Sequence, residues 1–318
     1  MSPEPVIGVD AGGTKLLAGA LAGDAEVHHR VYRLWGGGDR DQVLATMVEV
    51  VGEVMAAAPG VRSVGFGIPS LVDFETGTSV SSVHLPLDGV PFRDLMTERI
   101  GVPVHVDNDV NLALLAEVRV GSARGARNAV MLTLGTGIGG AIVIDGRLYR
   151  GADGAAGELG HVTVDFDGPP CQGNCPGRGC LEVYASGQAI GREGERVANE
   201  LRFSALGRSQ SQGVPITGEL VTDLALRGDA DAQGALALVG SRLGAGLVGI
   251  VNTFNPEVVV IGGGAARAGD LLLEPARRVV ADRALRPSRD TARIVRASLG
   301  ENAGLIGAAL FAREGGVA

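Results

Sequence analysis

The sequence predicts an α/β fold in which one arrangement of strands and helices occurs twice. Two units, each made of a strand, a glycine-rich turn and a second strand, stand in corresponding places, with their turns at Asp10–Thr14 and Gly135–Gly140. Each unit is followed by segments with helical spacing of apolar residues and by short apolar runs typical of buried strands. Hydrophobic residues make up 45% of the 318 residues, which is ample for packed cores. We therefore expect two domains that flank a cleft.

The first half is predicted to begin with three strands in an antiparallel meander, followed by a helix, a strand, a helix and a strand. In order, these elements are Val6–Val9, Leu16–Ala22, Glu26–Leu34, Asp41–Ala58, Val64–Ile68, Phe92–Ile100 and Val102–Val106. The long helix is indicated by Val43, Met47, Val50 and Val54, which recur at helical spacing. The last two strands look like parallel strands that are buried on both faces. This order is that of a ribonuclease-H-like half.

The second half is predicted to repeat the pattern, with two strands around the second glycine turn, then a helix, two strands and a closing helix. These elements are Ala129–Leu134, Ala141–Ile144, Gly234–Val251, Val258–Ile261, Arg293–Ala297 and Ala303–Ala312. The polar stretch Ser204–Gly218 is expected to be a mobile loop. The expected fold class is therefore a duplicated ribonuclease-H-like fold of the actin and hexokinase type. We expect a small domain of residues 1–108 and about 300–318, and a large domain of residues 109–299.

Charge and composition exclude several classes of protein. The net charge of −8 argues against a nucleic-acid partner, which usually needs a basic face. No basic region followed by an apolar stretch opens the chain, and no apolar run approaches the roughly 18 residues that cross a bilayer. We therefore expect a cytoplasmic protein without a membrane partner. All three cysteines lie between Cys171 and Cys180, and an odd, clustered count favours a metal site over disulfides.

The first glycine turn is a candidate for binding phosphate groups. Gly12 and Gly13 allow backbone N–H groups to approach phosphate oxygens, and Thr14 and Lys15 add side-chain donors. Asp10, at the end of the preceding strand, is placed to hold a magnesium ion through water. Taken alone, this turn could equally be an ordinary glycine hairpin.

Two further glycine clusters strengthen the phosphate-binding interpretation. The second turn contains Gly135, Thr136, Gly137 and Gly139, and a cleft lined by two such turns can hold a nucleoside triphosphate from both sides. The third cluster, Gly262, Gly263 and Gly264, follows a strand, where ligands of open α/β sheets bind, and could lie under an adenosine. Its alternative, a plain loop between strand and helix, stays open. The Gly-Lys-Ser/Thr ending of a P-loop is absent.

A group of carboxylates and amides, Asp107–Asn111, stands between the strand Val102–Val106 and a helical run at Leu112–Val118. Such residues can simply cap a helix. They also suit phosphoryl transfer, in which one carboxylate accepts the hydroxyl proton and its neighbours orient the acceptor. We favour the catalytic interpretation.

His161 and the three cysteines have the composition of a metal site. Cys171, Cys175 and Cys180 follow the histidine in a loop rich in proline and glycine, which supply the tight turns of a metal-binding knuckle. Thiolates and imidazole suit tetrahedral zinc, and a closed Cys₃His set implies a structural site. We therefore predict a zinc knuckle at residues 161–180.

These motifs together resemble the ROK family of sugar kinases and repressors, in particular its glucokinase-like members. The resemblance covers nearly the whole chain and rests on Asp10–Lys15, Asn108-Asp109, Leu134–Gly140, Gly157–His161 and Gly179–Glu182. It implies an enzyme that uses ATP and magnesium to phosphorylate a hexose, with glucose preferred, to the sugar 6-phosphate. It also implies one structural zinc and a homodimer or homotetramer.

The resemblance assigns roles to individual residues. Asp109 would be the catalytic base, and Asn108, Glu158, His161 and Glu182 would bind sugar hydroxyls together with it. The chain departs from the family pattern at two positions near the sugar. Ser70 ends the segment Gly67-Ile68-Pro69-Ser70, where the family has Gly-x-Pro-Gly, and His84 stands where glucokinase-like members commonly have asparagine. The spacing from Cys171 to Cys175 is two residues longer than the common Cys-x-Cys form.

Other substrates and other functions are compatible with parts of this pattern. The sugar could be mannose, fructose, N-acetylglucosamine or N-acetylmannosamine, because shared hydroxyl-binding residues do not distinguish them, and the donor could be polyphosphate. A sugar-responsive repressor of the same family would carry a helix-turn-helix segment ahead of the first strand at Val6, where we expect none. A sugar-binding module without activity would lack Asp10 or Asp109, and both are present.

Overall fold

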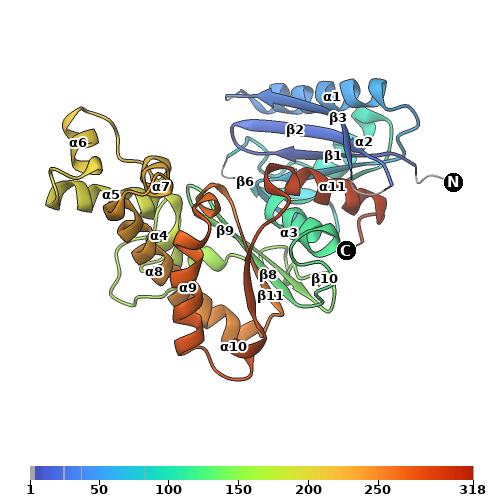
Figure 1. Cartoon of the computed structure of the whole chain (residues 1–318). Helices are drawn as coiled ribbons and strands as arrows, with labels where there is room; N and C mark the ends of the chain where they lie inside the picture. Colours follow the sequence, from blue (N-terminus) through green and yellow to red (C-terminus); the bar gives the residue numbers. More distant parts are fainter. Residues whose placement is uncertain (1–3, 24–25, 37, 83, 318) are drawn as a thin grey trace. The chain divides into compact units, whose positions relative to one another are not determined.

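The computed structural model describes residues 4–23, 26–36, 38–82 and 84–317. The chain forms two compact units. Unit 1 comprises Met1–Arg127, Ala141–Gly157 and Ser298–Ala318, and unit 2 comprises Asn128–Gly140 and Glu158–Ala297. Three separate segments of the chain thus make up unit 1, and the last of them is the C-terminal segment (Figure 1). The domain boundaries expected from the sequence stay a prediction.

Unit 1 contains a five-stranded sheet in the order β3-β2-β1-β4-β7. Its strands are β1 (Val6–Ala11), β2 (Lys15–Leu21), β3 (Val27–Leu34), β4 (Val64–Ile68) and β7 (Val104–Asn108). The first three pair antiparallel, whereas β4 is parallel to β1 and β7 is parallel to β4. The predicted meander and the two parallel strands are therefore confirmed. Because Asp10 pairs with Gly67, and Gly67 with Asp107, the polar ends of β1 and β7 reach the same edge of the sheet.

Helices cover both faces of this sheet (Figure 1). On one face, α1 (Arg40–Ala57) and α2 (Phe92–Ile100) pack against inward-pointing residues such as Ile7 and Val9. On the other face lie α3 (Asp109–Val120) and α11 (Ala303–Arg313), which contact the alternate residues of the strands, including Val6, Leu17 and Leu21. This alternation follows from the two-residue period of a strand. The side chain of Asp39 caps α1 by accepting a hydrogen bond from the Gln42 N–H.

The second sheet has the order β10-β9-β8-β11-β12. Its strands are β8 (Ala129–Leu134), β9 (Ile138–Ile144), β10 (Arg147–Leu148), β11 (Val258–Gly262) and β12 (Arg293–Arg296). Numbered along the chain within each sheet, both sheets have the same order, 3-2-1-4-5, and in both the fourth strand is parallel to its two neighbours. The expected duplicated α/β fold is confirmed. One correction concerns Ile138, Gly139 and Gly140, which belong to β9 and not to the preceding turn.

A hairpin of β5 (Ser70–Asp73) and β6 (Thr78–Ser82) in unit 1 was not predicted from the sequence. Its strands are short and rich in serine, so they lack the apolar alternation that marks a half-buried strand. The hairpin follows β4 directly and brings the backbone of Ser70 beside Asn108 at the end of β7.

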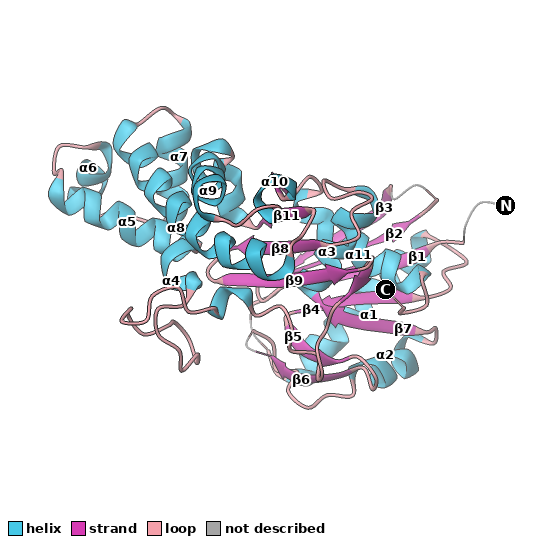
Figure 2. Ribbon diagram, turned by 90° about the horizontal axis from the view of Figure 1, so that it is seen from below, coloured by secondary structure: helices cyan, strands magenta, loops and turns pink. Residues whose placement is uncertain are grey.

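Unit 2 carries a group of helices beside its strands (Figure 2). They are α4 (Leu181–Ala185), α5 (Gly187–Glu200), α6 (Ala205–Ser211), α7 (Gly218–Leu226), α8 (Ala230–Phe254), α9 (Asp270–Arg283) and α10 (Ser288–Thr291). The expected loop at Ser204–Gly218 is wrong in part, because α6 lies within it. Ser204 caps α6 and Thr217 caps α7 through their hydroxyl oxygens, so these polar residues begin helices.

Helix α8 corrects the expectation that no apolar run is long enough to cross a membrane. An 18-residue window of α8 has a mean hydropathy of 1.7, and 56% of that window is buried inside the protein. By length and composition this helix could span a membrane, but buried core helices have the same properties. Gly240 and Gly244 face the backbone of α9, since a β-carbon on them would lie 2.2 Å from the Leu272 oxygen and 2.7 Å from the Ala276 oxygen. The apolar surface of α8 thus serves close packing between helices.

The closing helix α11 lies unusually near the sheet of unit 1. A β-carbon on Gly8 of β1 would come within 2.0 Å of the Leu305 oxygen, and one on Gly65 of β4 would come within 1.8 Å of the Ala308 oxygen. Both obstacles are backbone atoms, which cannot turn aside as a flexible side chain can. The sheet therefore accepts α11 only because these strand positions lack a side chain.

We expect Gly65→Ala to lower the free energy of unfolding by about 2 kcal/mol or more, because the added methyl group must push α11 away from β4. Urea unfolding followed by circular dichroism would measure the change. Gly52→Ala is the matched control, since Gly52 lies in α1 with open space around its position. That control should raise stability by roughly 0.5–1 kcal/mol through helix propensity. Equal stabilities of the Gly65 variant and the parent chain would show that α11 does not depend on this contact.

Candidate functional site

Two carboxyl groups lie at the edge of the sheet in unit 1. Asp10 is in β1, and Asp109 is the first residue of α3, directly after β7. Burial raises the pKa of Asp10 to about 6, although the Lys15 charge acts in the opposite direction. Burial also raises the pKa of Asp109 to about 7, and the neighbouring charge of Asp10 raises it further. A carboxyl group that titrates near neutral pH is suited to accept and release a proton.

The side chain of Asn108 caps α3. Its oxygen accepts hydrogen bonds from the N–H groups of Val110, at 2.9 Å, and Asn111, at 3.3 Å, and its amide nitrogen donates to the Ser70 oxygen at 3.2 Å. The capping role that we considered for this stretch is therefore confirmed for Asn108. Its binding of a sugar hydroxyl stays a prediction. The cap fixes where α3 begins and, with it, the position of Asp109.

Asp107 and Arg150 form a buried ion pair that the sequence did not indicate. Arg150 places its Nε and Nη2 atoms 2.7 and 2.6 Å from Oδ2 of Asp107. The other oxygen of Asp107 accepts hydrogen bonds from the Asn108 N–H and the Asn111 side chain. A carboxylate at the end of a buried strand needs a partner, but the sequence does not say which arginine supplies it. The pair anchors the junction that carries Asn108 and Asp109.

The first glycine turn is fixed by hydrogen bonds from the residue that follows β3. Trp35, just beyond that strand, donates its indole N–H to the Gly12 oxygen at 2.8 Å and its backbone N–H to the Thr14 oxygen at 3.1 Å. Gly13 faces His84, since a β-carbon there would lie 3.0 Å from the Cβ atom of His84. His84, the position that departs from the family pattern, thus lies against this turn. Neither Trp35 nor this contact was predicted.

We define the second glycine turn as Gly135–Ile138 in unit 2. The Gly135 N–H donates to the Gly137 oxygen at 2.9 Å, and the Gly135 oxygen accepts a hydrogen bond from the Gly187 N–H at 2.8 Å. The Ile138 N–H donates to Oε2 of Glu182 at 2.7 Å. The predicted turn between two strands is confirmed over Gly135–Gly137, and Ile138 already begins β9.

A cavity of about 940 Å³ opens beside this turn. Of the predicted nucleotide-binding residues in unit 2, Gly135, Thr136, Gly263 and Gly264 line it, and Gly137, Gly139 and Gly262 do not. Gly262 is instead the buried last residue of β11. The volume suits a drug-sized or nucleotide-sized ligand. The sequence did not indicate the remaining wall, which includes the polar residues Gln188, Arg192, Glu195, Thr217, Glu219, Thr222, Asp223, Arg267 and Arg296.

The three residues of unit 2 that the resemblance assigns to sugar binding lie around the cysteine cluster. Glu158 precedes the 3₁₀-helix η1 (Leu159–His161), and its carboxylate lies 3.8 Å from Nε2 of His161. Glu182 lies in α4 and is largely buried, with one oxygen bonded to the second glycine turn and the other 3.8 Å from the Cys171 sulfur. Asn108 and Asp109 belong to unit 1 and the other three to unit 2.

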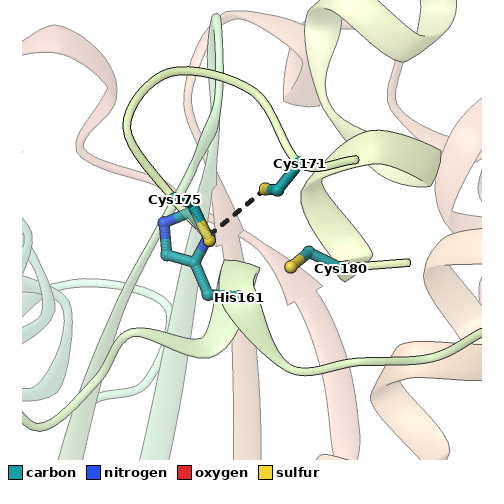
Figure 3. Close-up of side chains that lie close together, drawn as sticks. All are labelled: His161, Cys171, Cys175 and Cys180. Carbon is teal, nitrogen blue, oxygen red and sulfur yellow. Dashed lines mark hydrogen bonds between the residues drawn. The ribbon is translucent and has the colours of Figure 1, made fainter. Parts of the chain in front are cut away.

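The four predicted metal ligands converge (Figure 3). The Sγ atoms of Cys171, Cys175 and Cys180 and a ring nitrogen of His161 all lie within 4.8 Å of one another, and Nδ1 of His161 is 3.5 Å from the Cys171 sulfur. Tetrahedral zinc with bonds of about 2.0–2.3 Å separates its ligand atoms by roughly 3.5–3.8 Å, and the distance from Nδ1 of His161 to the Cys171 sulfur lies in this range. The longer spacing between Cys171 and Cys175 does not remove Cys171 from the cluster.

Burial raises the pKa of the Cys171 thiol to about 12, and hydrogen bonds with Cys180 and Cys175 add to this effect. Burial raises the pKa of Cys180 as well. Such thiols stay uncharged by themselves, whereas a bound divalent cation favours their thiolate form. A cation bound by these four side chains would therefore have to displace the thiol protons.

Comparison with known proteins places these features in a family. The sequence profile of the ROK family matches residues 6–315. A glucokinase from Thermotoga maritima is 36% identical over 312 residues, which cover 97% of this chain and 97% of that protein. A xylose repressor from Caldicellulosiruptor bescii is 31% identical over 262 residues, which cover 78% of this chain and 62% of the repressor.

Among solved structures, a ROK family glucokinase from Streptomyces griseus in complex with glucose and AMPPNP superposes with a TM-score of 0.85. It is 32% identical in sequence, and the match covers 98% of this chain and 99% of that one. The duplicated sheets, the glycine turns and the Cys₃His cluster thus occur in a chain whose sequence matches one family almost from end to end, and this chain belongs to the ROK family.

Proposed function

We propose that this chain is an ATP-dependent hexose kinase that transfers the γ-phosphoryl group of ATP to the 6-hydroxyl of glucose. The observation that carries the proposal is the carboxyl group of Asp109, held at the start of α3 with a pKa of about 7. Phosphoryl transfer to a sugar needs such a base, because the attacking hydroxyl must lose its proton. The likeness to the glucokinases of Thermotoga maritima and Streptomyces griseus supports ATP and glucose as substrates.

The cavity in unit 2 supports the nucleotide part of the proposal. Its walls combine the glycine turn at Gly135 and Thr136 with Gly263 and Gly264 and with three arginines, Arg192, Arg267 and Arg296. Backbone N–H groups and guanidinium groups are the usual partners of phosphate oxygens. We therefore assign the cavity to ATP, with the phosphates at the glycine turn and the nucleoside at Gly263 and Gly264.

In unit 1, the first glycine turn would hold the transferring phosphoryl group through Gly12, Gly13, Thr14 and Lys15. Burial raises the pKa of Asp10 despite the Lys15 charge, and a cation beside this carboxylate would favour its charged form. Magnesium bound there through water would neutralise charge on the phosphates. Asp109 would take the proton of the sugar hydroxyl, with Asn108, Glu158, His161 and Glu182 orienting the sugar.

The Cys₃His cluster would hold a structural zinc ion, since four protein ligands leave no open coordination position. With Nδ1 of His161 on the metal side, the Nε2 nitrogen is directed away from the cluster, near Glu158. A metal bond at Nδ1 fixes the tautomer and the orientation of the ring, which is what a histidine that binds a sugar hydroxyl requires. We further propose a cytoplasmic homodimer or homotetramer.

A panel of sugars tests the proposal. With ATP and magnesium, glucose should give the highest kcat/KM, and mannose, fructose, N-acetylglucosamine and N-acetylmannosamine should give lower values. A coupled assay of ADP release measures this, and mass spectrometry of the product should show a sugar 6-phosphate. Polyphosphate in place of ATP should support little turnover. Absence of turnover with every sugar, together with sugar-dependent binding to DNA, would instead favour the function of the related repressor.

Asp109→Asn should lower kcat by about 10²–10⁴-fold and leave the dissociation constant for glucose nearly unchanged, because the amide keeps the shape but cannot accept the proton. Steady-state kinetics and calorimetric binding would measure the two quantities. Asp282→Asn, an exposed change on α9, is the control and should behave like the parent enzyme. A variant that keeps more than a tenth of the parent turnover would exclude Asp109 as the base.

The same Asp109→Asn change should stabilise the protein at high pH. The pKa of Asp109 is about 7 in the folded chain against an ordinary value of 3.8, so between these values the folded chain binds the extra proton. The carboxyl therefore favours folding at low pH and loses that contribution as pH rises through 7. Without ligands, urea unfolding should show a gain of roughly 1–3 kcal/mol at pH 8 that shrinks toward pH 5. An equal effect at both pH values would contradict the raised pKa.

A further inference from the structure

We propose that the metal-binding segments of unit 2 also fix the second glycine turn, so that loss of the metal releases this turn and weakens binding of nucleotide phosphates. Gln172 and Glu182 are the positioning residues. Contacts within unit 2 support the effect on the turn, whereas the effect on nucleotide binding rests on the proposed function.

Glu182 joins the cysteine cluster to the turn directly. It lies two residues after Cys180, and its Oε2 atom accepts a hydrogen bond from the Ile138 N–H at 2.7 Å. Its Oε1 atom is 3.8 Å from the Cys171 sulfur. The carboxylate lies so close to the turn that a β-carbon on Gly137 would be 2.1 Å from Oε2. The Glu182 carboxylate thus occupies the space that a side chain at position 137 would need, so only glycine fits there.

The two remaining metal-binding segments touch the turn through residues next to a ligand. Gln172 follows Cys171, and its side-chain amide donates to the Thr136 oxygen at 3.3 Å. Gly160 precedes His161, and a β-carbon there would lie 2.3 Å from the Ile138 oxygen. His161, Cys171 and Cys180 thus come from three separate stretches of chain, and each stretch contacts the turn of Gly135–Ile138.

The metal-binding loop between these stretches has little regular secondary structure, although backbone hydrogen bonds such as Cys171 N–H to the Gly177 oxygen close its turns. Between Val162 and Gly179, the structure contains isolated bridges at Thr163 and Pro170 but no helix or longer strand. Small loops of this kind depend on a bound metal for their order. We therefore expect the metal to join three segments that support the turn on separate sides.

Hydrogen–deuterium exchange tests this directly on the full-length protein. Elemental analysis should first find about one zinc per chain, and a chelator then removes it. We expect the peptide covering Leu134–Gly140 to exchange faster in the metal-free protein, because the Ile138 N–H loses its fixed acceptor. The strand β11, at Val258–Gly262, should keep its protection. Unchanged exchange at 134–140 would overturn the proposal, and so would an equal loss of protection in β11, which would indicate general unfolding.

Nucleotide binding gives the second readout, measured by calorimetry without sugar. Metal removal should weaken AMPPNP binding at least about tenfold, as expected for loss of a hydrogen bond to a charged group, and should change adenosine binding by less than about twofold. Equal losses for both ligands, or no loss, would overturn the proposal. If the zinc-bound protein binds neither ligand, the proposed kinase function fails, while the exchange experiment still decides whether the metal holds the turn.

A variant that keeps the metal but loses one contact to the turn shows whether that contact matters by itself. Gln172→Ala should retain zinc and weaken AMPPNP binding about threefold, because one neutral hydrogen bond to the turn is lost. Gln210→Ala, on the exposed surface of α6, is the matched control and should bind AMPPNP like the parent. An AMPPNP affinity of the Gln172 variant equal to that of the control would overturn the role of Gln172.

Discussion

The close approach of one backbone segment to another, possible only where a residue lacks a β-carbon, is the constraint on which this structure depends. It seats α11 on the sheet at Gly8 and Gly65 and brings α8 against α9 at Gly240. It also leaves room for the Glu182 carboxylate at Gly137. The 51 glycines of the chain are therefore not only turn residues, because several of them determine how near neighbouring elements can lie.

Carboxyl groups are buried at the end of the first sheet. Their burial lowers the stability of the fold, and it also raises the pKa values on which the proposed chemistry depends. Asp107 is buried with a full set of partners, which include Arg150 and Asn111, so its charge is compensated. For Asp10 and Asp109, burial outweighs the Lys15 charge and the hydrogen bond from the Val110 N–H, and their pKa values rise for that reason. The same short stretch of sequence thus contains one carboxylate that holds the backbone and another that remains available for a proton.

The metal cluster and the glycine turn in unit 2 form one connected piece of structure. Glu182 contacts both, and Gln172 and Gly160 extend the connection from two further segments. A structural metal in this position would do more than stabilise a loop, because the backbone donors of a phosphate site must be held in place to be effective. Glu158 and His161, which we propose to bind the sugar, lie on one of these segments, so a bound ion would support residues proposed for both substrates.

The sequence by itself determined the duplicated α/β fold, most strand positions and the four residues that form the Cys₃His cluster. Those features depend on local periodicity, on turn chemistry and on residue type, and β4, α2 and β8 begin and end where their apolar patterns do. Only the tertiary structure decided the partner of Asp107, the support of the first turn by Trp35 and the wall of the cavity. These depend on contacts between residues far apart in the chain, such as Asp107 with Arg150, and no local pattern specifies them. Helix α6 was missed because its polar residues resemble a loop until Ser204 and the packing of Leu206 are seen in place.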